Sequence, residues 1–224
     1  MAEIHIDHLI RSRRRTVTLE IDRDGKLIVR APLRMREADI RHMVASKAAW
    51  IEAHQSTART RLTQNPPPRF ITGELFWFLG ERYPLQIVPS QRPALTLEGK
   101  FKLSASAQPR ARQVFIDWYR QAARQVISRR LDFYTSQHKF PYKAVRITSA
   151  RTRWGSCSSK GNLSFSWRLV MTPQTAIDYV VLHELVHLVE PNHSPRFWAQ
   201  IAKIMPAYQE QRRWLRQNGH QFNL

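Results

Sequence analysis

The feature that most constrains this fold is an apolar run, residues 177–189, interrupted by two histidines and a glutamate. His183 and His187 stand four residues apart, with Glu184 directly after the first, in the pattern H-E-x-x-H. On an α-helix this spacing puts both imidazoles on one face, within reach of a single ion, and Glu184 beside the water that the ion activates. A buried helix tolerates these polar groups when they are paired or bind a metal. The run therefore predicts a buried metal-binding helix, with hydrogen-bonded core histidines as the alternative.

A third histidine, His193, follows His187 by six residues. Pro191 disfavours helical geometry at Glu190 and lacks a backbone donor, while Asn192 tolerates the left-handed conformation that often ends a helix. We expect the chain to turn after Glu190 and to bring His193 back to the ion. Three-histidine zinc sites that leave a fourth position for water are well attested. Glu190 is a rival ligand, or a partner of one.

Length, cysteine content and the N-terminus limit the class of protein. A chain of 224 residues can form one large domain, or a small module and a catalytic one. The single cysteine, Cys157, excludes internal disulfide bonds and fits a reducing compartment. Residues 1–15 contain no apolar signal segment, and no run reaches the roughly 18 apolar residues that span a bilayer. A cytoplasmic location is the expectation.

The chain is strongly basic, with 36 Lys and Arg against 17 Asp and Glu. The basic residues cluster in four segments: 11–15, 34–41, 110–130 and 212–216. Such charge favours a nucleic acid or a phosphate-bearing substrate as partner. Solvated helix faces are the competing interpretation, because the charge is spread over several segments.

The N-terminal region, residues 1–64, is expected to form a β-hairpin followed by a long helix. Polar and apolar residues alternate on either side of the turn signal Asp24-Gly25. An apolar stripe then predicts a helix over 36–62. The break at Asn65-Pro66-Pro67-Pro68 predicts a linker to a catalytic region, 65–224, with the two regions packed as one structural unit.

The catalytic region alternates short strands with helices. Turn signals predict short strands over 70–104, and apolar spacing predicts a second long helix over 108–138. Residues 144–171 indicate a hairpin with a Ser- and Gly-rich tip. Thr172-Pro173 is expected to begin the metal-binding helix, with Thr172 as its cap, and Ser194-Pro195 to begin the next one.

Two parts of the sequence together resemble the YgjP-like metallopeptidase domain family, which is related to the SprT-like zincin metalloproteases. They are Arg153-Trp154-Gly155-Ser156-Cys157, and the H-E-x-x-H pattern with Asn192-His193-Ser194 and Phe197-Trp198. The resemblance covers nearly the whole chain and is most specific over 151–214. It implies an α+β, zincin-like fold in which a twisted, mostly antiparallel sheet lies over the H-E-x-x-H helix. By motif match it implies His183, His187 and His193 as ligands of a zinc ion and Glu184 as general base.

The resemblance leaves the substrate of this metal-dependent hydrolase open. A metallopeptidase should pair an extended peptide with an exposed edge strand near 163–167. Some family members are assigned hydrolysis of nucleoside triphosphates, UTP in particular, and a pyrophosphohydrolase should place arginines on phosphates. Arg151 and Arg153, two apart on a presumed strand, are candidates for that role, and Trp154 is a substrate-binding or packing residue. A third hypothesis is a basic nucleic-acid-binding protein with a structural metal site.

Overall fold

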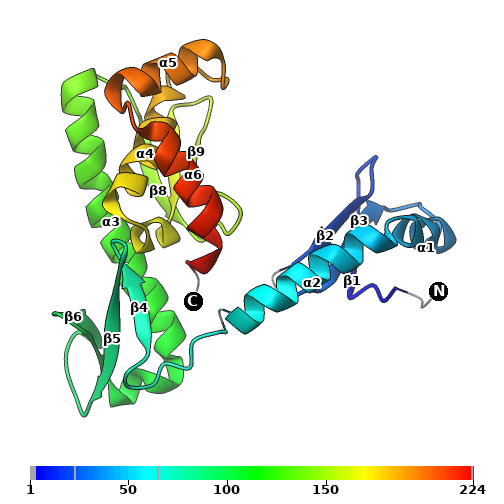
Figure 1. Cartoon of the computed structure of the whole chain (residues 1–224), viewed down its shortest axis with the longest axis horizontal. Helices are drawn as coiled ribbons and strands as arrows, with labels where there is room; N and C mark the ends of the chain where they lie inside the picture. The colour runs from blue at the N-terminus through cyan, green and yellow to red at the C-terminus, as the bar shows by residue number, and fades with distance from the viewer. Residues whose placement is uncertain (1–3, 23, 65, 223) are drawn as a thin grey trace. The chain divides into compact units, whose positions relative to one another are not determined.

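A computed structural model describes residues 4–22, 24–64, 66–222 and 224 of the chain. The chain divides into two compact units, residues 1–67 and 68–224, whose elements are labelled in Figure 1. The expectation that the N-terminal region packs against the remainder stays a prediction. None of the helices within the described ranges is both long and apolar enough to cross a membrane.

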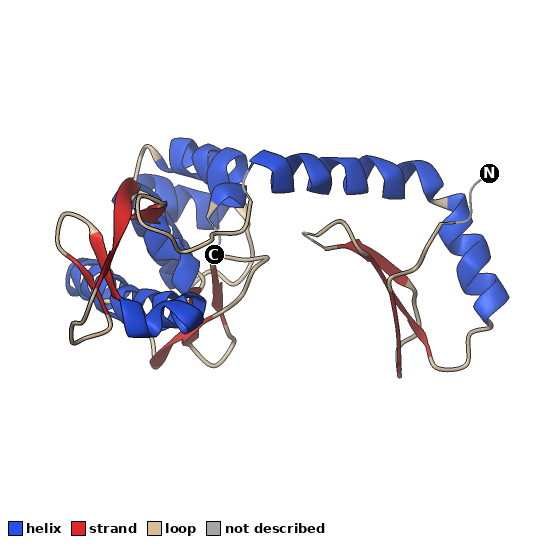
Figure 2. Cartoon of the chain, turned by 90° about the horizontal axis from the view of Figure 1, so that it is seen from below, coloured by secondary structure: helices blue, strands red, loops and turns tan. Residues whose placement is uncertain are grey.

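The first unit is a three-stranded sheet covered by two helices, which lie on one side of the strands in Figure 2. Its elements are β1 (His8–Ser12), β2 (Thr18–Ile21), β3 (Leu27–Pro32), α1 (Glu37–Ser46) and α2 (Ala48–Gln64). The antiparallel pairing of β2 with β3 confirms the predicted hairpin, and β1 pairs with β3 in parallel. Leu27, Val29 and Ala31 alternate along β3 and are fully buried, because this face of the pleat meets the helices. The single helix predicted over 36–62 is interrupted at Lys47, which ends α1.

The second unit contains two further sheets and four α-helices among the described residues. The elements before the H-E-x-x-H segment are β4 (Leu75–Phe78), β5 (Glu81–Val88), β6 (Leu95–Leu97), β7 (Phe101–Ser104), η1 (Ala105–Arg110), α3 (Ala111–His138), β8 (Ala144–Thr148), β9 (Gly155–Cys157), β10 (Asn162–Ser166) and η2 (Trp167–Met171). Those that follow are α4 (Gln174–Val186), α5 (Pro195–Ile204), α6 (Tyr208–Asn218) and η3 (Gly219–Gln221). The α+β class is confirmed. The strands are divided among small sheets of mixed parallel and antiparallel pairing, rather than gathered in one mostly antiparallel sheet.

The long helix α3 contributes buried residues along much of its length to the core of this unit. The predicted helix over 108–138 is confirmed, and it begins at Ala111 after the 3-10 turn η1. Phe115, Tyr119, Ile127 and Leu131 share one face and are fully buried, since their spacing follows the helical repeat. Figure 1 shows α3 (green) running beside the segment that carries α4, which packs against it.

The sheet next to α4 has the order β8-β10-β9. The hairpin predicted over 144–171 is correct for β9 and β10, which are antiparallel, but β8 pairs with β10 in parallel. The expectation of an exposed edge near 163–167 is wrong, because β10 is the central strand with a partner on each side. Within this sheet the edge that lies nearest α4 belongs to β9 instead.

Candidate metal centre

The helix α4 is buried on nearly all its faces, as its apolar sequence predicts. It packs against α3, α5, α6 and β9. Its buried residues are Ala176, Ile177, Tyr179, Val180, Val181, Leu182, Glu184, Leu185 and Val186. The start of the helix differs from the prediction: the hydroxyl of Thr172 donates to the carbonyl of Leu169 at 2.8 Å, and Pro173 occupies the capping position. Thr172 thus closes the preceding 3-10 turn rather than capping α4.

The C-terminal end of α4 directs the chain back toward the helix. The α-helix ends at Val186, earlier than the turn expected after Glu190, and residues 187–189 form a turn. The backbone amides of Leu188 and Val189 bond to carbonyls three residues earlier, at 3.0 Å each, which tightens the last turn. The next helix then begins as predicted: the side chain of Ser194 accepts from the amide of Phe197, and Pro195 is the first residue of α5.

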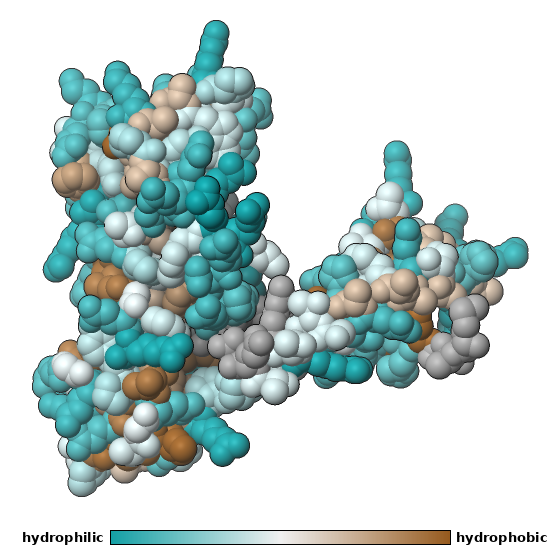
Figure 3. All heavy atoms as spheres, viewed as in Figure 1, coloured by the Kyte–Doolittle hydropathy of each residue, from teal (hydrophilic) through white to brown (hydrophobic). Residues whose placement is uncertain are grey.

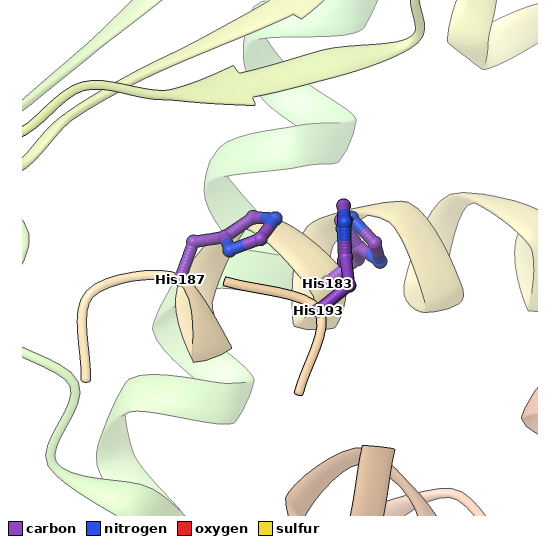
Figure 4. Close-up of side chains that lie close together, drawn as sticks. All are labelled: His183, His187 and His193. Atoms are coloured by element: carbon purple, nitrogen blue, oxygen red, sulfur yellow. The ribbon is translucent and has the colours of Figure 1, made fainter. Parts of the chain in front are cut away.

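Three imidazoles meet at this turn. One ring nitrogen from each of His183, His187 and His193 lies within 4.8 Å of the others, and Figure 4 shows the rings facing one another from α4 and the loop that follows it. The Nε2 atoms of His183 and His193 are 3.0 Å apart. Nδ1 of His187 lies 3.2 Å from the carbonyl oxygen of Glu190, which leaves Nε2 of that ring for the cluster. Among the described residues, the Glu190 carboxylate is not part of the histidine group. Glu190 therefore contacts His187 through its backbone carbonyl rather than through its side chain.

The donor set fits a divalent cation. Tetrahedral zinc at ~2.1 Å from each imidazole nitrogen places those nitrogens ~3.4 Å apart. This value lies between the 3.0 Å of the His183–His193 pair and the 4.8 Å within which all three nitrogens lie. Burial, followed by the charges of His187 and His193, lowers the pKa of His183 to about 3. Burial also lowers the pKa of His193, followed by the effects of His187 and Arg212. These two rings are therefore neutral at pH 7 and keep a lone pair for a metal.

Glu184 is buried against the backbone of β9. Its exposed fraction is only 6%, and a Cβ placed on Gly155 would lie 2.6 Å from both Cγ and Oε1 of this glutamate. Burial raises the pKa of Glu184 to about 7, while the charge of Arg153 and a hydrogen bond from the Cys157 backbone lower it. A carboxyl group with a pKa near neutrality can both take and return a proton.

The three predicted substrate-binding residues lie at different places. Arg151 and Arg153 are exposed in the loop between β8 and β9, so the prediction that they share one face of a strand is wrong. Of the two, Arg153 acts electrostatically on Glu184. Trp154 is half-buried; its ring lies edge-on to Phe222 at 6.4 Å, and a Cβ on Gly219 would lie 2.9 Å from it. Trp154 therefore packs against the C-terminal segment while also facing the cavity described next.

A cavity of about 320 Å³ opens beside the histidine cluster, between α4 and α6. Its lining residues are Trp154, Gly155, Tyr179, Val180, His183, Glu184, Arg212, Leu215 and Arg216. No motif in the sequence identifies Tyr179, Arg212 or Arg216 as residues of this cavity. The available signal was the basic segment 212–216, but nothing in the sequence places that segment next to α4.

Together, the three histidines and the buried carboxyl form a group within an α+β unit that could hold a metal ion. The family model of the YgjP-like metallopeptidase domain matches residues 15–218, and the chain belongs to this family. A metallopeptidase domain implies a metal, and the three histidines form a group that can hold one. No curated protein and no solved structure matches the sequence.

Proposed function

We propose that this protein is a zinc-dependent metallopeptidase with a zincin-like fold. His183, His187 and His193 hold the ion, and Glu184 is the general base. The observation that carries the proposal is the burial of the Glu184 carboxyl, 6% exposed, directly after one of three converging imidazoles. The residues that the structure describes form no salt bridge with Glu184. An unpaired buried carboxyl is costly in a structural role, whereas a general base needs the raised pKa that burial produces.

A divalent cation at this site supplies Lewis acidity, which activates water and polarises a carbonyl group. Glu184 takes the proton of the attacking water and passes it to the leaving amine. The close approach of Gly155 and the hydrogen bond from the Cys157 backbone fix the direction of the carboxyl. The carbonyl of Glu190 orients the His187 ring by accepting from Nδ1.

The edge of β9 provides a place for an extended peptide. β9 is an outer strand of its sheet, and its first residue, Gly155, contacts Glu184. A peptide that adds to such an edge forms backbone hydrogen bonds along its length, so its recognition depends little on sequence. This position brings the substrate backbone next to the general base.

Hydrolysis of a nucleoside triphosphate at the same metal site is the second candidate. The observation that favours it is the presence of Arg212 and Arg216 in the cavity wall, since guanidinium groups bind phosphates well. The two functions differ in substrate but share the cluster and Glu184.

The test is to incubate the zinc-loaded protein with an unfolded protein and with the four nucleoside triphosphates, and to measure both kinds of product. Glu184→Gln should retain the metal and lose about 10²- to 10⁴-fold in rate, because it removes the base without changing the size of the side chain. Glu190→Gln is the matched control and should keep both metal and activity. Full turnover by Glu184→Gln would refute the assigned base, and nucleotide cleavage without peptide cleavage would replace the leading proposal with the second. Nucleic-acid binding without any hydrolysis would support a structural metal site instead.

A further inference from the structure

The wall of the cavity opposite the histidine cluster carries two arginines from α6. Arg212 and Arg216 are four residues apart, so both project from the same face of the helix. Glu184 is the acidic residue among the lining residues, and it lies on the α4 side. In Figure 3 hydrophilic residues cover the visible surface around α6.

Within the described ranges of the chain, neither arginine has a carboxylate partner. Like charges one helical turn apart destabilise a helix slightly. Glu210, in the first turn of α6, is the acidic residue of this helix. The two guanidinium groups therefore form an uncompensated positive wall, which an anion in the cavity would stabilise.

The structure also fixes the position of Arg212 relative to the metal cluster. Its guanidinium lies over the ring of Trp198, 4.6 Å from the centroid. The same ring stacks on His193, with centroids 5.5 Å apart and planes 19° apart. Arg212 therefore lies between the histidine cluster and the cavity, where it can contact a substrate that occupies both.

From this geometry we propose that Arg212 and Arg216 form an oxyanion-binding subsite that holds a negatively charged group of the substrate close to the cleaved bond. The inference rests on the proposed hydrolase function and specifies its substrate class. In a peptide the anion is the free C-terminal carboxylate; in a nucleotide it is a phosphate. Both present oxygen atoms in a geometry that suits the guanidinium fork.

The test measures binding rather than turnover. Calorimetric titrations use two peptides of identical sequence, one with a free C-terminal carboxylate and one amidated, and inorganic phosphate as a third ligand. The Glu184→Gln background prevents cleavage of the bound peptides. Arg212→Gln with Arg216→Gln is compared with Arg213→Gln, which changes an exposed arginine of the same helix that does not line the cavity. Circular dichroism verifies that the variants keep their helices.

We expect the double variant to bind the anionic ligand about tenfold more weakly, as the loss of charge-assisted hydrogen bonds implies, and Arg213→Gln to bind it normally. A preference for the free acid over the amide that disappears in the double variant identifies a carboxylate subsite. Arginine-dependent phosphate binding with no such preference identifies a phosphate subsite. Equal binding of every ligand by the double variant and the Arg213→Gln control would overturn the proposal. Failure of peptide hydrolysis alone would refute the peptidase and leave the subsite standing.

Discussion

Helices α4 and α6 pack against each other, yet they meet the solvent in opposite ways. Most residues of α4 are buried, including Glu184, whereas Tyr208 and Leu215 are the buried residues of α6. Burial raises the pKa of Glu184, while the exposed face of α6 keeps the charges of its arginines hydrated. The proposed general base therefore depends on exclusion of water, whereas the arginines proposed to bind an anion depend on access to it.

This contrast predicts different consequences of substitution. Changes that disturb α4 or its immediate contacts should reduce activity or the free energy of unfolding, because its environment is closely packed. Changes on the exposed face of α6 should alter binding and leave stability within about 0.5 kcal/mol.

Among variants outside the metal ligands and the general base, the largest effect is expected for Gly155→Ala. The added methyl group would lie 2.6 Å from Cγ and Oε1 of Glu184, so the carboxyl must move. Gly155 has no positive φ that alanine would strain, so the displacement of Glu184 is the main consequence. We expect kcat/KM to fall about 100-fold, the cost of misplacing a catalytic group by about 1 Å. The measurement is steady-state kinetics on whichever substrate, unfolded protein or nucleoside triphosphate, the wild-type protein hydrolyses.

Ser156→Ala, on the same strand, is the control for Gly155→Ala and should retain most of the activity. Both variants should bind the metal normally, since neither residue belongs to the histidine group. Wild-type kinetics for Gly155→Ala would show that the contact with β9 does not position the base.

An intermediate effect is expected where α4 is anchored to α3. Arg130 donates two hydrogen bonds to Asp178, and the side chains are only 20% and 14% exposed. Removing one partner of a buried pair is strongly destabilising, and with the remaining exposure we expect Arg130→Met to cost about 2 kcal/mol of unfolding free energy. Urea denaturation followed by near-ultraviolet circular dichroism measures it. The exposed neighbour Arg129→Met is the control; equal loss in both variants would contradict the anchoring role.

The smallest effect is the pH dependence of the same variant. Burial raises the pKa of Asp178, and Arg130 lowers it in part, so Arg130→Met should raise that pKa further. A carboxyl group whose pKa is higher in the folded state than in the unfolded state binds protons preferentially when folded, so stability is gained as the pH falls through that pKa. The destabilisation by Arg130→Met should therefore be smaller at pH 5 than at pH 8. An equal or larger loss at pH 5 would contradict this assignment.

Local patterns in the sequence predicted the parts of the site that local chemistry determines. The spacing of His183 and His187 on an apolar helix and the Ser194-Pro195 start of α5 were both readable, because each depends on neighbouring residues. The turn that returns His193 was expected from Pro191. It begins earlier, since the hydrogen bonds at the end of α4 tighten before the proline is reached.

Long-range pairing could not be predicted in the same way. The strand pattern near 163–167 does not reveal that β8 pairs with this strand in parallel, which makes β10 central and moves the edge to β9. Likewise Arg153 was expected on a strand, but it lies in the loop between β8 and β9, where its charge acts on Glu184. Substrate binding by Arg153 stays a prediction. Arg212 joins the site only because α6 packs on α4. Such contacts depend on tertiary packing, which leaves no periodic signal in the sequence.

The proposed function requires that three imidazoles share one divalent cation. The most direct measurement is the metal content of the purified, zinc-loaded chain by inductively coupled plasma mass spectrometry, compared with that of His193→Ala. We predict one tightly bound ion per chain in the wild type and its loss on dialysis of the variant, because the three ring nitrogens lie within 4.8 Å of one another. A wild-type chain without stoichiometric metal after loading, or a variant that retains the ion as firmly as the wild type, would contradict the account.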